Sequence, residues 1–228
     1  MDDLEAELAR ARELDVGALA DAIESIGFEC TRCGGCCTAE TPDEATEGDD
    51  QVEPHTATVF PEEIRTLQDS GDYDFRDVAR PMPYGLTERD EGLEGETFEW
   101  ALQTDDCGDC TFYTENEGTG TCTVHDDRPL ICQTYPFSLA LGGTSQPMGE
   151  AVDSDGLVRA HECEGLDQDI SRSNAEDLAA TLKERAIREL EEAIAVREQY
   201  RPVDGGGIVV YDSEGPKQVD GTPWGPRD

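Results

Sequence analysis

The segment FECTRCGGCCTAE, residues 28–40, sets four cysteines in the spacing C-x2-C-x2-C-C: Cys30, Cys33, Cys36 and Cys37. A two-residue gap lets successive thiolates converge on one centre, while the backbone amides of the turn point toward the sulfur atoms. Side chains of adjacent residues diverge in most backbone conformations, so Cys36 and Cys37 can serve two different centres. The segment is too short, polar and glycine-rich for four buried apolar cysteines. It therefore predicts a thiolate metal site that organises the fold.

Five more cysteines follow: Cys107, Cys110, Cys122, Cys132 and Cys163. The first two repeat the two-residue gap, and the next two flank TVHDDRPLI, whose centre is typical of a turn. With the early four, they supply enough thiolates for two four-thiolate sites or one larger cluster, with one cysteine left over. The odd count, in a chain expected to be cytoplasmic, argues against structural disulfides.

The ordered elements Cys-x2-Cys-Gly-x-Cys-Cys, Cys-x-Phe and Cys-x-Val-His-x2-Arg-Pro-x2-Cys-x2-Tyr-Pro-Phe resemble the YkgJ-type cysteine-cluster family over residues 28–166. The residues that carry this resemblance are Cys30, Cys33, Gly34, Cys36, Cys37, Cys110, Phe112, Cys122, Val124, Arg128, Pro129, Cys132, Tyr135, Pro136 and Phe137, with Cys163 as the late cysteine. The family is described as a candidate zinc- or iron-chelating domain and is often labelled as containing iron–sulfur. The resemblance therefore implies a metal domain more firmly than any reaction.

Eight metal ligands are predicted on this basis: Cys30, Cys33, Cys36, Cys37, Cys110, Cys122, Cys132 and Cys163. Two positions depart from the family pattern. Cys107 lies outside it and is either a free thiol or a substitute ligand. His125 stands where the family often carries Tyr, so it is not expected to be an obligatory ligand.

Thiolate ligation suits both zinc and iron–sulfur clusters. Zinc held by four thiolates is closed and structural, whereas the C-x2-C-x2-C start with a distant fourth ligand such as Cys132 favours an iron–sulfur cluster. We favour iron–sulfur, chiefly on the family's label. Four thiolates around a divalent ion leave a net charge of about −2, so Arg128 and Arg32 are predicted to lie beside the sulfurs as cofactor-binding residues. The alternative for Arg128 is a turn residue paired with Asp126 or Asp127.

Other residues near the motifs receive more ordinary expectations. Tyr135 and Phe137 are expected to be core side chains covering the site. His55 and His161 are expected to be ordinary polar residues, although His161 is close enough to Cys163 in sequence to assist a site. No residue pattern indicates catalysis, because a phosphate loop, a Rossmann fingerprint and a nucleophile elbow are all missing from the sequence. Whether the protein is an enzyme stays open, and no catalytic residue is assigned.

Composition indicates a salt-adapted cytoplasmic protein. The chain has 228 residues and a formal net charge of −37, with 54 acidic residues and only two lysines among its 17 cations. Such a chain repels itself except at high salt, where the Debye length falls to about 3 Å. Leu, Ile, Val and Phe make up only 42 of the 228 residues, so metal is also expected to support the fold. Direct nucleic-acid binding is not expected without a basic patch, and no apolar stretch is long enough for a membrane span.

Periodicity predicts a helix over residues 2–26, a strand leading into a helix over 57–68, a strand over 97–103, and a helix over 173–199. Two short hairpins are predicted, one around the turn at 117–120 and one, or a loose extension, after residue 205. Residues 69–96 show no clear period. The expected fold class is α+β: a small irregular metal domain with short strands, flanked by an N-terminal and a long C-terminal helix. The expected organisation is an N-terminal helix (1–27), the cysteine domain (28–170), the C-terminal helix (171–201) and a tail (202–228).

Two functions are consistent with this sequence. The first is a cytoplasmic metal-binding protein whose cysteine-ligated iron–sulfur or zinc centre transfers electrons or carries a cluster. The second is a structural zinc domain without redox activity, whose helices dock a protein partner that the sequence does not identify.

Overall fold

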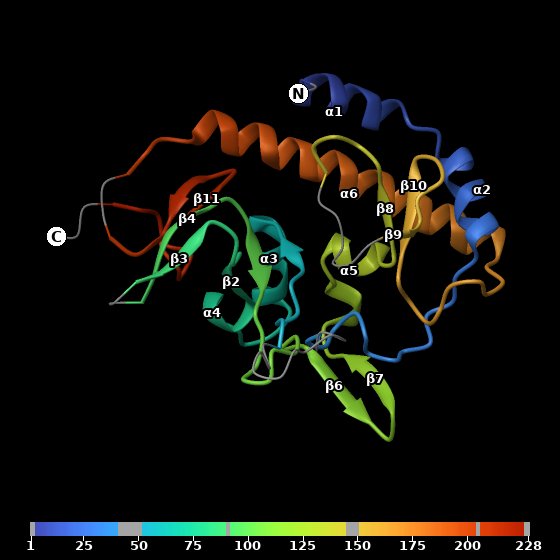
Figure 1. Ribbon diagram of the computed structural model, residues 1–228, viewed down its shortest axis with the longest axis horizontal. Helices are drawn as coiled ribbons and strands as arrows, with labels where there is room; N and C mark the ends of the chain where they lie inside the picture. Colours follow the sequence, from blue (N-terminus) through green and yellow to red (C-terminus); the bar gives the residue numbers. More distant parts are fainter. Residues whose placement is uncertain (1–2, 41–51, 90–91, 145–150, 204–205, 226–228) are drawn as a thin grey trace, which may run out of the picture.

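The computed structural model describes residues 3–40, 52–89, 92–144, 151–203 and 206–225. The protein is α+β, as predicted: a long helix, α6 (Arg172–Gln199), runs across the molecule, and small sheets of short strands pack along it (Figure 1). The other helices are α1 (Leu4–Glu13), α2 (Val16–Ile26), α3 (Pro61–Asp69), α4 (Phe75–Val78), α5 (Leu130–Thr134) and the 3-10 helix η1 (His125–Asp127). Within the described ranges, no helix is both long and apolar enough to cross a lipid bilayer.

The strands of the described residues form four small sheets. The first is β1 (Thr58–Val59), β5 (Trp100–Leu102) and β2 (Ala79–Pro81); the second is β8 (Phe137–Leu139), β10 (Val158–His161) and β9 (Ala151–Asp153); the third is β12 (Gly215–Lys217), β11 (Ile208–Asp212), β4 (Gly92–Thr97) and β3 (Leu86–Arg89); the fourth is the hairpin β6 (Tyr113–Asn116) and β7 (Thr119–Cys122). Paired strands are antiparallel except β11 and β4, which run parallel with Ile208 opposite Gly95.

The prediction of one helix over residues 2–26 is wrong, because the chain breaks between α1 and α2. Leu14 has an extended backbone, with ψ 133°. Asp15 caps α2, since its Oδ1 accepts a hydrogen bond from the backbone N–H of Ala18 at 2.8 Å. An Asp that satisfies a free N–H at a helix start favours a new helix there over continuation of the old one. The apolar residues keep their helical spacing across the break, so the pattern did not reveal it. Residue 2 lies outside the described residues.

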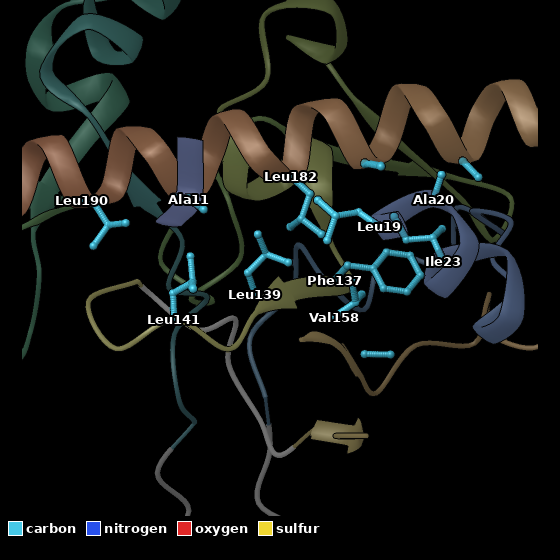
Figure 2. Packing of buried hydrophobic residues seen from close by; sticks show 14 of the residues in the cluster. Ala11, Leu19, Ala20, Ile23, Phe137, Leu139, Leu141, Val158, Leu182 and Leu190 are labelled. Atoms are coloured by element: carbon cyan, nitrogen blue, oxygen red, sulfur yellow. The ribbon is translucent and has the colours of Figure 1, made fainter. Parts of the chain in front are cut away.

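The first hydrophobic core lies between α6, α1, α2 and the sheet β8-β10-β9 (Figure 2). Its fully buried side chains include Leu19, Ile23, Phe137, Leu139, Val158, Leu182 and Leu190. The predicted C-terminal helix is confirmed, and Ser171 caps it by accepting from the N–H of Asn174 at 3.2 Å. Its apolar face supplies Leu182 and Leu190 to this core, so α6 is the surface on which the N-terminal helices pack.

The second hydrophobic core lies beneath the sheet β1-β5-β2 and helices α3 and α4. It contains Trp100, Ile64 and Phe112 together with Cys110, and Cys37, Cys122 and Cys132 pack against its edge. The cysteine-bearing segments are therefore a continuation of this core rather than an appendage. The predicted strand and helix of residues 57–68 are confirmed as β1 and α3, and the predicted hairpin is β6–β7.

Two stretches differ from expectation. Residues 69–96 hold α4, β2, β3 and the first five residues of β4, although they show no period, because each element is too short to display one. The strand predicted over 97–103 is in fact two, since β4 ends at Thr97 and β5 begins at Trp100. The hairpin expected after residue 205 is confirmed as β11–β12. It lies within the segment expected to be a tail, but it is built into the third sheet and buries Tyr211.

Candidate metal centre

The first cysteine segment leaves α2 and is tied at once to the chain that leaves β10. Gly27 ends α2 with φ 78°, and Phe28 forms an isolated β-bridge with Leu166. The N–H of Glu29 then donates to the carbonyl of Gly165 at 2.9 Å. These contacts bring the start of the C-x2-C-x2-C-C motif beside the segment that carries the late cysteine.

The middle of the motif is a tight turn. Gly34 has φ 85°, and its carbonyl accepts from the N–H groups of Cys37 at 2.7 Å and Thr38 at 3.1 Å. A side chain at Gly34 would meet the Tyr113 hydroxyl, since its Cβ would lie 2.1 Å from that oxygen. The turn sets the Sγ atoms of Cys36 and Cys37 3.7 Å apart.

The second cysteine segment is fastened to this turn through the backbone. The N–H of Cys110 donates to the carbonyl of Cys37 at 2.8 Å, and the N–H of Gly120 donates to the carbonyl of Arg32 at 2.8 Å. The hairpin β6–β7, which ends at Cys122, therefore starts and finishes against the first motif. Main-chain hydrogen bonds thus bring together segments that are far apart in sequence.

Helix α5 carries Cys132 and is held at its start by the half-buried Glu63 and at its end by the buried Arg185. Glu63 in α3 accepts from the N–H of Leu130 at 2.8 Å, which supports the start of α5. Arg185 in α6 donates to the hydroxyl of Thr134 at 3.0 Å and to the carbonyl of Phe137 at 3.2 Å, which secures its end. Arg185 is itself paired with Glu189 at 2.7 Å. These ties fix the position of α5 relative to both cores.

The interactions between thiols show which sulfurs lie near each other. Burial raises the pKa of Cys132 well above its usual value, and Cys110, Cys36 and Cys122 raise it further. Burial also raises the pKa of Cys110 to about 11, with Cys122 and Cys36 among the causes. The structure thus brings Cys36, Cys110, Cys122 and Cys132 into one neighbourhood.

A second neighbourhood surrounds Cys163. Burial raises the pKa of its thiol, the N–H of Gly165 opposes this, and Cys33, Cys36 and Cys30 raise it again. Cys36 belongs to both neighbourhoods; its hydrogen bond with Cys37 is the largest cause of its raised pKa. Cys107 is exposed and takes part in neither neighbourhood through any of these interactions.

The positive charge of Arg128 acts on the thiols of both Cys122 and Cys36. Burial raises the pKa of the Cys122 thiol, and the Arg128 guanidinium acts against that rise. Its Nε donates to the carbonyl of His125 at 2.9 Å, so the η1 turn holds the side chain in place. Arg32 has an exposed side chain and φ 59°, and its contribution here is its backbone carbonyl. That Arg32 supports the sulfurs stays a prediction.

The remaining predicted residues surround the cysteines without joining them. Tyr135 donates to the carbonyl of Glu162, and burial followed by nearby thiols, Cys163 first, raises its pKa. Phe137 is fully buried in the first core and packs edge-on against Phe28, with ring centroids 5.7 Å apart. His161 is buried, with Nε2 2.9 Å from the hydroxyl of Ser138.

His55 is buried, and burial lowers its pKa to about 4. His125 is exposed, with Nδ1 3.4 Å from Asp126. That His55 is an ordinary polar residue and that His125 is not an obligatory ligand both stay predictions.

The chemistry of the donor set fits a soft metal. All nine cysteines are free thiols, so none is committed to a disulfide. Thiolates in this number suit zinc or iron–sulfur. No three Cys, His, Asp or Glu side chains of the described residues already stand in a coordination arrangement. Which of these thiols hold the metal stays a prediction.

A family model matches residues 29–164, and its name, CxxCxxCC, spells the spacing of Cys30, Cys33, Cys36 and Cys37. The chain belongs to the CxxCxxCC family. The family is described as "Putative zinc- or iron-chelating domain", which supports metal binding and zinc or iron as the metal. No curated protein and no solved structure matches the chain. The CxxCxxCC match spans both cysteine segments and the late Cys163, and it stops just before α6.

The sequence did not point to the buried charges around α5. Glu63 follows Pro61 at a helix start, where its Oε2 also accepts from the N–H of Phe60 at 2.9 Å, and this capping pattern is visible in the sequence. Arg185 and Glu189 are four residues apart on a helix, a spacing usually found on solvated faces. Nothing in the sequence indicated that Arg185, which lies outside residues 29–164, contacts the end of α5.

Proposed function

We propose that this CxxCxxCC-family protein binds metal through two four-thiolate groups that meet at the adjacent residues Cys36 and Cys37. Group one is Cys30, Cys33, Cys36 and Cys163; group two is Cys37, Cys110, Cys122 and Cys132. The observation that carries the proposal is that Cys36 interacts with Cys163 as well as with Cys110 and Cys132, while the adjacent Cys37 packs against the second core, so the two residues can divide between the groups. This division uses all eight predicted ligands and leaves Cys107 out.

Iron–sulfur clusters are the proposed occupants, and electron transfer or cluster carriage is the proposed role. A bound iron–sulfur cluster supplies one-electron redox chemistry. Two groups joined at consecutive residues suit the passage of an electron from one to the other. Arg128, close to Cys122 and Cys36, offsets the negative charge that the thiolates concentrate.

The second candidate is a structural zinc domain that docks an unidentified protein partner. Its support is that the proposed groups contain only cysteine, which is typical of closed zinc sites with no open position. This candidate predicts zinc in stoichiometric amounts and no redox activity.

The decisive experiment is elemental analysis and a visible spectrum of the full chain purified without oxygen. Iron–sulfur binding requires brown protein with iron and acid-labile sulfide in equal amounts. Colourless protein containing only zinc would reject the clusters and favour the zinc scaffold.

The two-group division is tested by three variants. Cys163→Ser and Cys132→Ser are each expected to lose about half of the metal, because each removes a ligand from a different group. Cys107→Ser is the matched control and should retain all of it. A Cys163→Ser protein that keeps its circular dichroism but loses all metal would instead indicate one shared cluster, and full retention by Cys132→Ser would remove that residue from the ligand set.

The surroundings of the protein are also part of the proposal. With a net charge of −37 and a predominance of Arg over Lys, we propose a salt-rich cytoplasm as its compartment. The same charge supports the absence of direct nucleic-acid binding, since few cations are present to displace counterions.

A further inference from the structure

A cleft of about 670 Å³ lies away from the cysteines, between the C-terminal half of α6 and strands β1, β4 and β5. No cysteine is among the residues that line it. Its volume is in the range of small-molecule sites. Nothing in the proposed metal function uses this cleft, so its lining calls for a separate explanation.

Aromatic side chains stand exposed at its mouth. Tyr84 is 67% exposed and Phe98 is 47% exposed, and both line the cleft. Phe98 stacks on Tyr211 with centroids 5.6 Å apart at 21°, and its centroid is 5.9 Å from that of Tyr200. Aromatic faces grouped at one concave site, rather than scattered over a surface, indicate contact with a ligand.

Three of the carboxylates that line the cleft have neutral hydrogen-bond donors. Glu96 accepts from the hydroxyls of Tyr200 at 3.3 Å and Tyr211 at 3.2 Å. Asp212 accepts from the indole N–H of Trp100 at 3.0 Å. A further wall residue, Glu192, accepts from a backbone N–H, that of residue 213, at 2.8 Å. Neutral donors satisfy these oxygens but leave their negative charge in place.

The cations near the cleft are engaged with other acids. Arg197 lines it but forms its ion pair with Glu5. Lys217, which interacts with Asp212, pairs with Glu214 at 2.9 Å. Burial raises the pKa of Asp212, the direction expected for an anion with incomplete compensation. Arg188, which acts on Glu192, is likewise paired with Glu62. Because these cations are shared with other acids and the donors to Glu96 are tyrosine hydroxyls, the cleft is electrostatically suited to an added positive charge.

We propose that this cleft binds a small organic cation: a protonated amine that carries an aromatic or aliphatic group. The ammonium lies against Glu96 and the faces of Phe98 and Tyr200, where carboxylate and ring quadrupole attract it together. The apolar group of the ligand rests on Tyr84 and the apolar wall. An exposed acidic surface alone offers neither the rings nor the enclosure, which is what separates this cleft from the general acidity of the chain.

The test is calorimetric titration of the full metal-loaded chain with phenethylamine hydrochloride, at fixed KCl concentration. Saturable binding at one site is expected, together with no binding of 3-phenylpropionate, which has the same ring and the opposite charge. Phe98→Ala and Glu96→Gln are each expected to weaken binding about tenfold, the size of a desolvated cation–π or charge contact.

The matched control is Glu115→Gln, which removes one charge from the exposed strand β6. It should leave the affinity unchanged. If Glu115→Gln weakened binding equally, or if the heat grew without saturation, the amine would be attracted only by the overall negative charge of the protein. Either result would overturn the proposal. Metal content is measured in every sample, and it stays constant if the cleft and the cysteine groups are separate sites.

Discussion

Arg185 in α6 donates from Nη1 to the hydroxyl of Thr134 at 3.0 Å, so the longest helix of the protein directly holds the one-turn helix that carries Cys132. The guanidinium is buried, and its Nε lies 2.7 Å from Glu189, with side-chain exposures of 3% and 6%. A buried pair of this kind matters less for its own energy than for what it holds in place. Here it connects the helical face of the first core to the cysteines.

Arg185→Met is expected to destabilise the protein by about 3–5 kcal/mol, because it leaves the charge of Glu189 buried without its arginine. The double variant Arg185→Met, Glu189→Met should recover most of that loss. Urea unfolding at constant salt measures both. Arg12→Met, which removes an exposed ion pair with Glu191, is the control and should change stability by less than about 1 kcal/mol. A single variant as stable as the wild type would show that Arg185 does not hold α5.

Gly165→Ala is expected to loosen Cys163 from the first motif. An added Cβ would lie 2.2 Å from the carbonyl oxygen of Glu29, the residue whose N–H donates to the carbonyl of Gly165. Since backbone cannot move aside as a flexible side chain can, we expect the free energy of unfolding to fall by about 1–3 kcal/mol and the metal content to be lower. Gly142→Ala, whose Cβ would meet open space, should stay within about 0.5 kcal/mol of the wild type. Equal behaviour of the two variants in thermal unfolding would contradict the prediction.

Asp212→Asn is expected to change how stability depends on pH. Burial raises the pKa of Asp212 in the folded protein above its unfolded value of about 4. The folded state therefore holds this proton more tightly, and the stabilising contribution present below about pH 4 is lost as pH rises through the folded pKa. The difference in unfolding free energy, wild type minus Asp212→Asn, should fall between about pH 4 and the folded pKa of Asp212 and then level off. A difference that rises with pH would show that Asp212 is better compensated than its surroundings indicate.

Salt is expected to stabilise the protein. With a net charge of −37, lowering KCl from 2 M to 0.1 M extends the Debye length from a few ångströms to about 10 Å and restores the repulsion between acidic side chains. The melting temperature should fall steeply over that range with metal content unchanged. The same melting temperature at both concentrations would reject the salt-adapted interpretation.

The extent to which the sequence predicts this structure depends on the size of each element. The long helix α6 and the β6–β7 hairpin follow directly from periodicity and turn residues. The break at Asp15 was hidden because the apolar spacing continues through it, and β2, β3 and β4 were missed because three to six residues rarely show a pattern. For the site, the spacing identified the cysteines as a set, but only the fold shows that Cys36 interacts with both Cys163 and Cys132. Arg185 could not be found from sequence, since its partners lie in a distant segment.

Because β11 pairs in parallel with β4, the third sheet can form fully only after residues 208–212 have been synthesised. Ile208 lies opposite Gly95, so almost half of the polypeptide separates the two partners. On the ribosome, β4 emerges long before β11, so of its two neighbours in the sheet only β3 is beside it until residues 208–212 emerge. Its other edge stays open during that interval, and a chain that stalls before Ile208 would expose to other nascent chains a strand that the finished protein keeps covered.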